Sequence, residues 1–185
     1  MSEEPSEQAT VLVVEDEEHL ADLYTEYLSD TYDVRTAYGG IDAMEMLSSE
    51  LDVVLLDRRM PVVSGNEVLA DIEERGLRCR VAMVTAVDPD FDIIDMGCDD
   101  YIVKPVTRDE LLEVVDRLLK ISEYNDTMRD LTAKKLKRNV LQVEKTDTEL
   151  KSSDEFRKLQ TEIEEMESQI DDLADDLGTE YVSQL

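Results

Sequence analysis

The run Val53–Leu56 contains four consecutive apolar residues, and Asp57 follows it directly. An uninterrupted apolar run of this length is typical of a strand that is buried on both faces, in the middle of a parallel sheet. Pro61 and Gly65 mark the loop beyond it. Ligands of open parallel sheets bind outside the carboxyl ends of the strands. Asp57 is therefore either a functional residue at that edge or an ordinary turn residue, since aspartate is also common in turns.

The hydrophobic pattern around this run predicts an alternation of strands and helices. Further strands are expected at Thr10–Val14, Asp33–Ala37, Arg80–Thr85 and Asp100–Val103. Helices are expected near residues 20–28, 41–47, 66–75 and 90–96. Strands that alternate with helices form an α/β domain with a parallel sheet. We place this domain at residues 10–120, after a disordered acidic segment at residues 1–9.

The predicted strands end in residues that bear a charge or a hydroxyl group. Glu15 and Asp16 follow the first strand, Thr85 ends the fourth, and Lys104 follows the fifth. If these strands are neighbours, three carboxylates repel one another at one edge of the sheet, beside a hydroxyl and an ammonium group. Mg²⁺ binds to a few carboxylates together with water and phosphate, and such a set of groups can stabilise phosphoryl transfer. Asp57 is the predicted nucleophile, because carboxylates accept phosphoryl groups in aspartyl-phosphate chemistry.

These strand ends resemble the receiver domain of two-component response regulators, over roughly the first two thirds of the chain. The resemblance is carried by Glu15-Asp16, Asp57, Thr85 and residues 97–105, GCDDYIVKP. It implies a five-stranded, flavodoxin-like parallel sheet with the strand order 2-1-3-4-5. It also implies a phosphoacceptor that assists its own phosphotransfer, rather than an enzyme, and a sensor histidine kinase as the phosphoryl donor.

The resemblance implies a magnesium site. Asp16 and Asp57 would ligate Mg²⁺ directly, Glu15 would act mainly through water, and the backbone carbonyl of Arg59 would be the third protein ligand. The side chain of Arg59 would lie near the phosphoryl group and influence its lifetime. The alternative for Asp16 is a plain N-cap of the first helix.

The resemblance also implies a switch. Lys104 would pair with a phosphoryl oxygen, Thr85 would hydrogen-bond another after phosphorylation, and Tyr101 would be the aromatic switch residue. The alternatives are an ordinary surface lysine at position 104 and simple packing of Tyr101 in its strand.

The charge of the chain is extreme, because 19 Lys and Arg residues stand against 47 Asp and Glu residues, a net of 19 − 47 = −28. Such a surface repels nucleic acid and destabilises the compact state, unless salt screens it; the Debye length falls to ~3 Å at 1 M. The composition therefore favours a salt-rich cytoplasm. No run approaches the ~20 apolar residues of a membrane span, and residues 1–9 lack the pattern of a signal peptide. Cys79 and Cys98 are expected to be reduced, buried thiols.

Residues 121–185 are predicted to form a helical tail. Thr107 and Glu110 form a capping box, and because neither glycine nor proline occurs between Pro105 and Gly178, the helix that starts there can continue to about residue 140 or 143. Its apolar positions are Leu111, Val114, Leu118, Ile121, Met128 and Leu131. A bend is expected at residues 144–153, which hold two further capping boxes, Thr146 with Glu149 and Ser152 with Glu155. A heptad seam follows at Phe156, Leu159, Ile163, Met166, Ile170, Leu173 and Leu177.

The two arms of the tail have opposite charge. Residues 129–145 have a net charge of 6 − 2 = +4, and residues 146–185 have 3 − 13 = −10. A helical hairpin would fold the acidic arm onto the basic one, so that their charges offset each other. It is favoured over a DNA contact, because the tail lacks helix-turn-helix spacing and zinc ligands. The tail resembles the HalX domain of haloarchaea from about Tyr124 to Leu185.

The predicted function is a response regulator that accepts a phosphoryl group on Asp57 with Mg²⁺ and switches its helical output tail, with transcription regulation as one outcome. The alternative is an interaction scaffold or adaptor that acts through the tail without phosphorylation control. A homodimer through the tail or through the last helix of the receiver is left open, as is DNA binding.

Overall fold

A computed structural model describes residues 8–178. The chain forms two compact units, Met1–Leu119 and Lys120–Leu185. Most of the predicted disordered segment, residues 1–7, lies outside the described residues, as do residues 179–185 at the end of the predicted tail. The first unit contains a five-stranded parallel sheet with the strand order β2-β1-β3-β4-β5. The predicted flavodoxin-like topology is therefore confirmed.

The strands of this sheet are β1 (Thr10–Val14), β2 (Asp33–Ala37), β3 (Val53–Leu56), β4 (Arg80–Thr85) and β5 (Asp100–Val103). All four residues of β3 are buried, as the apolar run predicts for a central strand. Its register with β1 pairs Val11 with Val53 and Val14 with Leu56, so that the two strands end side by side. This register brings the residues that follow β1 and β3 to the same edge.

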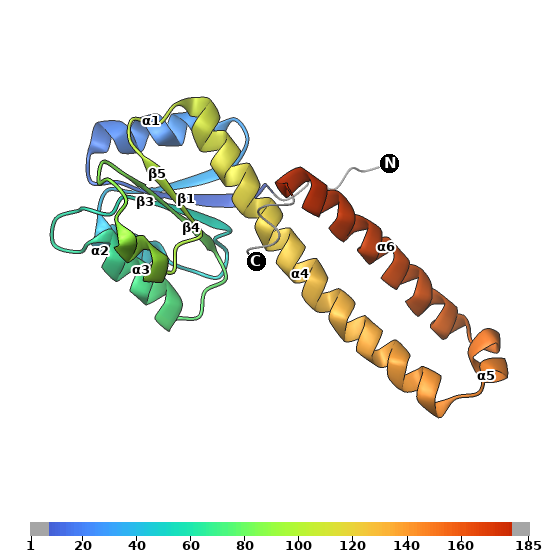
Figure 1. Ribbon diagram of the computed structural model, residues 1–185. Coiled ribbons are helices and arrows are strands. Elements are labelled where there is room, and N and C mark those ends of the chain that lie inside the picture. Colours follow the sequence, from blue (N-terminus) through green and yellow to red (C-terminus); the bar gives the residue numbers. More distant parts are fainter. Residues whose placement is uncertain (1–7, 179–185) are drawn as a thin grey trace. The chain divides into compact units, whose positions relative to one another are not determined.

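The helical segments of the first unit are α1 (Glu18–Ser29), α2 (Gly40–Met46), α3 (Gly65–Glu74) and η1 (Phe91–Asp95), followed by the beginning of α4 (Arg108–Glu144). Figure 1 shows α1 on one side of the sheet, and α2 and α3 on the other. A capping box between Ser64 and Glu67 opens α3. The segment η1 is a 3-10 helix, so the regular helix expected near residues 90–96 forms only as this tighter and shorter element.

The second unit begins within α4, a helix of 37 residues that opens at the predicted capping box, where the Thr107 amide donates to Glu110 at 2.8 Å. Two further helices follow, α5 (Asp147–Ser152) and α6 (Asp154–Leu177). Thr146 and Glu149 form the predicted capping box of α5. The bend expected at residues 144–153 thus contains a helical turn of its own.

The predicted capping box of Ser152 with Glu155 is wrong. Ser152 is the last residue of α5, and its hydroxyl donates to the carbonyl of Glu149 at 2.9 Å. Ser153 has the extended backbone that an N-cap requires, with φ −85° and ψ 121°, and its hydroxyl accepts from the Phe156 amide at 3.1 Å. The cap therefore lies one residue later than predicted, because α5 already includes Ser152.

The tail folds as the predicted hairpin, in which α6 packs along the second part of α4 (Figure 1). Its small core consists of Leu131, Ile163 and Ile170, with Tyr124, Leu159 and Met166 partly buried around it. Ion pairs join the arms, from Lys134 to Glu162 and from Lys135 to Glu167, each at 2.6 Å. Met128, one of the apolar positions of the predicted helix, is 39% exposed, whereas Thr127 is buried, because the helical spacing from Tyr124 to Leu131 passes through residue 127.

No helix in the described part of the chain is long and apolar enough to cross a membrane. Both cysteines are free thiols; Cys79 is buried, but Cys98 is only half-buried, which corrects the expectation for the second residue. Burial raises the pKa of the Cys79 thiol to about 11. This thiol is therefore protonated and unreactive at neutral pH.

Candidate functional site

The predicted site residues meet at the carboxyl edge of the sheet, because backbone hydrogen bonds between neighbouring strands continue one residue beyond the end of the strand. The Asp57 amide donates to the Val14 carbonyl at 3.0 Å, and the Lys104 amide donates to the Thr85 carbonyl at 2.8 Å. A cavity of about 520 Å³ opens there. It is lined by Glu15, Asp16, Glu17, Leu20, Asp57, Arg59, Thr85, Ala86, Val87 and Lys104. Of the predicted site residues, only Tyr101 lies outside this lining.

A larger hollow, of about 680 Å³, lies at the opposite edge of the sheet, where Thr10 and Asp33 begin their strands. It has a mixed set of surface residues, including Arg35 and Glu50, which form an exposed ion pair. In a parallel sheet, chemistry is expected at the carboxyl edge instead. We therefore assign the candidate site to the smaller cavity.

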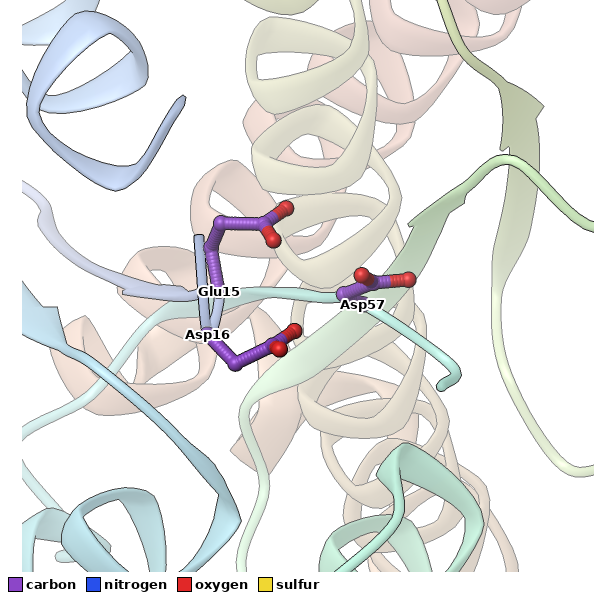
Figure 2. A group of neighbouring side chains, drawn as sticks. All are labelled: Glu15, Asp16 and Asp57. Atoms are coloured by element: carbon purple, nitrogen blue, oxygen red, sulfur yellow. The ribbon is translucent and has the colours of Figure 1, made fainter. Parts of the chain in front are cut away.

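Three carboxylates gather in this cavity (Figure 2). One oxygen atom from each of Glu15, Asp16 and Asp57 can be chosen so that all three lie within 4.8 Å of one another. Glu15 is 2% exposed and Asp57 is 8% exposed, whereas Asp16 is open to solvent. The side chain of Asp16 forms no cap of α1, since the N-cap residue is Glu17 and no side-chain cap bond is present.

Lys104 neutralises part of this charge. Its Nζ atom lies 2.5 Å from Glu15 Oε2 and 3.2 Å from Asp57 Oδ2. Burial lowers the pKa of Lys104, but the hydrogen bond to Glu15 and the charges of Asp57 and Glu15 outweigh this, so the pKa is raised and the ammonium is retained. Burial raises the pKa of Glu15, and the contact with Lys104 opposes this effect only in part.

The donors in this cavity fit a hard divalent cation. Carboxylate oxygens are the ligands that Mg²⁺ prefers, and one of the three carboxylates, Asp16, reaches into solvent, where a hydrated ion can approach. Lys104 contacts Glu15 and Asp57, but Asp16 has no basic partner in the part of the chain that the structure describes. The uncompensated negative charge is therefore located where a cation could bind.

Gly65 allows the loop after β3 to approach the site closely, a role that the sequence analysis missed. Its amide donates to the Arg58 carbonyl at 2.9 Å. A Cβ atom at position 65 would lie 2.2 Å from the carbonyl oxygen of Asp57 and 2.9 Å from the Cα atom of Arg58. Only glycine fits without moving the backbone of Asp57. The glycine was visible in the sequence only as a mark of a loop.

Thr85 and Tyr101 both contact the backbone of Val87. The Thr85 hydroxyl accepts from the Val87 amide at 3.3 Å, and the Tyr101 hydroxyl donates to the Val87 carbonyl at 2.9 Å. Thr85 is almost fully buried, and the ring of Tyr101 is half-buried against the core. One residue of the loop after β4 therefore joins the two predicted switch residues.

Arg58 is a second residue that the sequence analysis missed. Its guanidinium donates to the Tyr101 hydroxyl at 3.5 Å and forms an ion pair with Asp92 of η1. These hydrogen bonds, first to Tyr101 and then to Asp92, raise the pKa of Arg58. The side chain next to Asp57 thus contacts both η1 and Tyr101. The only signal in the sequence was a basic residue directly after the predicted phosphoacceptor.

Two family models match the chain, one for each compact unit. The model of the response regulator receiver domain matches residues 11–116, and the model of the HalX domain matches residues 120–185. The first match alone covers more than half of the chain and includes every predicted site residue.

Known proteins with similar sequences include a Haloferax volcanii protein named as a transcriptional regulator, which is 49% identical over 132 residues, 71% of this chain and 23% of that protein. The Staphylococcus aureus response regulator ArlR is 33% identical over 150 residues, 75% of this chain and 68% of that protein. The match to DltR of Streptococcus agalactiae covers 48% of its length, so the chain spans less than half of some relatives.

Solved structures with a similar fold include the response regulator TrrA of Thermotoga maritima in complex with Mg²⁺ and BeF, which is 33% identical. The match has a TM-score of 0.54 and covers 60% of this chain and 99% of TrrA. The DrrB receiver domain activated by BeF3 is 28% identical, with a TM-score of 0.55, over 61% of this chain and 98% of that domain. This chain belongs to the response regulator receiver domain family and has a HalX domain behind its receiver.

Proposed function

We propose that the chain is a phosphorylation-dependent switch in which Asp57 is the phosphoacceptor and the helical tail is the output. The observation that supports this most directly is the cavity in which Lys104 contacts Asp57 and Glu15, and in which the oxygens of Glu15, Asp16 and Asp57 lie within 4.8 Å. Asp57 is 8% exposed and faces about 520 Å³ of open space, enough for a phosphoryl group.

The proposed donor is a phosphohistidine of a sensor kinase. A carboxylate oxygen of Asp57 attacks the phosphorus atom; a P–O bond forms, the P–N bond breaks, and its electron pair goes to the imidazole nitrogen. Lys104, 3.2 Å from Asp57, holds its ammonium where negative charge develops on the transferred group. The chain acts as a substrate that assists its own modification, and Arg59 in the cavity lining influences how long the phosphoryl group persists.

The proposed cofactor is Mg²⁺, which when bound supplies positive charge to the phosphoryl oxygens. Asp16 and Asp57 are the proposed direct ligands, Glu15 acts through water, and the Arg59 carbonyl is the third protein ligand. The complex of TrrA with Mg²⁺ and BeF supports the choice of Mg²⁺ by analogy. The exposure of Asp16 would keep this side of the site open to ion and solvent.

The proposed switch runs from Thr85 to Tyr101. If the Thr85 hydroxyl turns to a phosphoryl oxygen, it gives up its bond with the Val87 amide, and the loop that accepts the Tyr101 hydroxyl is released. The helix α4 belongs to both compact units, and its first turn follows β5 by only a few residues. A change at β5 can therefore act on a helix that continues into the tail.

The proposed output is a contact with a protein partner rather than with DNA. Lys134 and Lys135 are paired with Glu162 and Glu167 across the hairpin, and this pairing uses basic charge that a DNA contact would need. The Haloferax volcanii relative is named as a transcriptional regulator, so transcription regulation through a partner is the proposed role. The proposed location is the cytoplasm.

The test compares Asp57→Asn with Asp42→Asn, a change of the same type at an exposed position of α2 outside the cavity. Each protein is incubated with acetyl phosphate and Mg²⁺, and its phosphoryl content is measured by intact-protein mass spectrometry. We expect the wild type and Asp42→Asn to gain the same phosphoryl mass and Asp57→Asn to gain none. Phosphorylation of Asp57→Asn at normal yield would remove Asp57 from its role.

A scaffold without phosphorylation control is the second candidate, because the hairpin has a core of its own. Beryllofluoride with Mg²⁺ separates the two functions. A switch should change the hydrogen-exchange protection of α4 beyond residue 119, whereas a scaffold should leave it as in the untreated protein.

A further inference from the structure

The helix α4 has a second apolar stripe, which is separate from its seam with α6. Leu136 and Val140 are each 61% exposed, and Val143 is 82% exposed. Ala133, one helical turn before Leu136, is exposed as well. Large apolar side chains that gather on one exposed face mark an interaction surface, whereas single ones carry no such meaning.

This stripe faces away from α6. The side of α4 that contacts α6 is defined by Leu131, in the hairpin core, and Lys134, paired with Glu162. At about 100° per residue, Leu136 lies about 140° from Leu131 around the helix axis, and Val140 lies about 180° from it. No described helix of the tail unit can therefore cover the stripe while α6 occupies its seam.

We propose that this stripe pairs with the same stripe of a second copy of the chain, with the two α4 helices parallel. The apolar positions 133, 136, 140 and 143 are separated by three, four and three residues, which is the spacing of a coiled-coil seam. With Ala133 and Val140 at the first core position of the heptad, Leu136 and Val143 take the second. In parallel coiled coils, a β-branched residue at the first position with leucine at the second, here Val140 with Leu136, favours two strands over larger assemblies.

The charges beside the stripe select the parallel arrangement. One flank holds Asp130, Lys137 and Glu144, each seven residues apart, and the other flank holds Thr132 and Asn139, which are uncharged. In a parallel pair, the charged flank of one helix meets the uncharged flank of the other. In an antiparallel pair centred on the stripe, Lys137 would meet its own copy, and Asp130 would meet Glu144 of the other helix.

The same flank argues against nucleic acid as the occupant. Lys137 is the one basic residue of the flank, between two acids, and a phosphate backbone would be repelled by both. Leu141 does not belong to the stripe, because it lines a separate hollow between the arms together with Phe156 and Leu159.

The dimer is expected to be weak and reversible. The stripe spans 11 residues, about 16 Å of helix, which is short for a stable interface. Each copy also has a net charge of −28, so association needs salt to screen the repulsion. This dimer does not depend on phosphorylation of Asp57, and its failure would leave the proposed function intact.

The test is sedimentation equilibrium of the full chain in about 2 M KCl, where the Debye length is below ~3 Å. We expect the apparent mass of the wild type to rise from 21.1 kDa towards twice that value as concentration increases. Val140→Asp should weaken association by about tenfold or more, because it places a charge in the seam. The matched control is Val62→Asp, the same change at a receiver position that is 83% exposed, and it should associate like the wild type.

Orientation is tested by Val140→Cys in a Cys98→Ser background, which removes the more accessible native thiol. In a parallel pair the two copies of residue 140 face each other, so mild oxidation should give a disulfide-linked dimer. Ser168→Cys, at an exposed position of α6, should link far more slowly. Circular dichroism of Val140→Asp should match the wild type, since the residue lies outside the hairpin core.

Three outcomes would overturn the proposal. The wild type could remain at 21.1 kDa over the whole range, or Val140→Asp could associate as well as the wild type. The third outcome is a monomeric wild type that binds duplex DNA at lower salt and loses that binding in Val140→Asp, which would assign the stripe to nucleic acid.

Discussion

The receiver unit and the tail both carry excess negative charge, but different interactions stabilise them. Residues 1–119 hold 9 basic and 30 acidic residues, a net of 9 − 30 = −21, and residues 120–185 hold 10 and 17, a net of 10 − 17 = −7. The receiver buries whole strands such as β3, and its core is large. The core cluster of the tail has three buried apolar residues, and ion pairs between the arms add to it.

This contrast shows which interactions each unit depends on. The receiver has helices on both sides of its sheet (Figure 1), so its stability comes mainly from buried apolar area. Its charge acts mainly as an overall repulsion. A two-helix hairpin buries one stripe per helix, so each buried side chain contributes a larger share of the total. Single core substitutions should therefore matter most in the tail, and screening of charge should matter most in the receiver.

The largest effect is expected when Ile163 and Ile170 are both replaced by Asp. Each side chain is at least nine-tenths buried in the hairpin seam, and two buried unpaired charges should cost about 5 kcal/mol or more, enough to unfold the tail. Circular dichroism at 222 nm should lose helical signal, while phosphorylation by acetyl phosphate stays intact. Thr161→Asp with Ser168→Asp adds the same charge on the exposed side of α6 and should keep the signal. Full helical signal in the first double variant would contradict the hairpin.

Salt should act more strongly on the receiver than on the tail. From about 0.1 M to 2 M KCl we expect the midpoint of receiver unfolding to rise by about 10 °C, because screening removes repulsion within a unit of charge −21. The tail should respond less, since salt weakens its ion pairs while it screens a smaller net charge. Near-ultraviolet and far-ultraviolet circular dichroism during heating separate the two transitions. Equal shifts in both would break the comparison.

A smaller effect is expected for the site alone. Asp16→Ala should lower Mg²⁺ affinity by about tenfold or more, since it removes a proposed ligand, and should leave the fold unchanged because the side chain is exposed. Isothermal titration calorimetry measures the affinity, and the unfolding midpoint serves as the fold control. Asp42→Ala, on the exposed surface of α2, should bind Mg²⁺ like the wild type. Unchanged affinity in Asp16→Ala would remove this residue from the ligand set.

The smallest effect on stability is expected for Arg58→Ala. The ion pair with Asp92 is half-exposed on the acidic side, so its loss should cost about 1 kcal/mol or less. The variant should nevertheless raise the hydrogen-exchange rate around Tyr101, which loses a hydrogen-bond donor. Arg59→Ala, which removes a neighbouring guanidinium without a contact to Tyr101, is the matched control. Identical exchange in both variants would show that Arg58 does not restrain the switch residue.

Much of the fold was readable from local patterns. The bounds of Thr10–Val14 and Arg80–Thr85 follow from apolar runs that end in a charge or a hydroxyl group, and the structure has strands with these same bounds. Parallel pairing then brings strand ends to one edge wherever the strands lie in sequence, which is why Glu15, Asp57 and Lys104 meet as predicted. The heptad of α6 likewise required a helical partner, and α4 of the same chain is that partner.

Other features depended on contacts between residues distant in the chain. Arg58 and Asp92 are separated by 34 residues, and no periodicity links them, because Arg58 lies in a loop and Asp92 in the short 3-10 helix η1. The shift of a helix cap from Ser152 to Ser153 depended on whether a turn of helix formed in between. Apolar residues such as Leu136 and Val140 fit a helix equally well on either face. Only packing against α6 decided which face is buried and which remains available to a partner, since burial of one stripe excludes the opposite one.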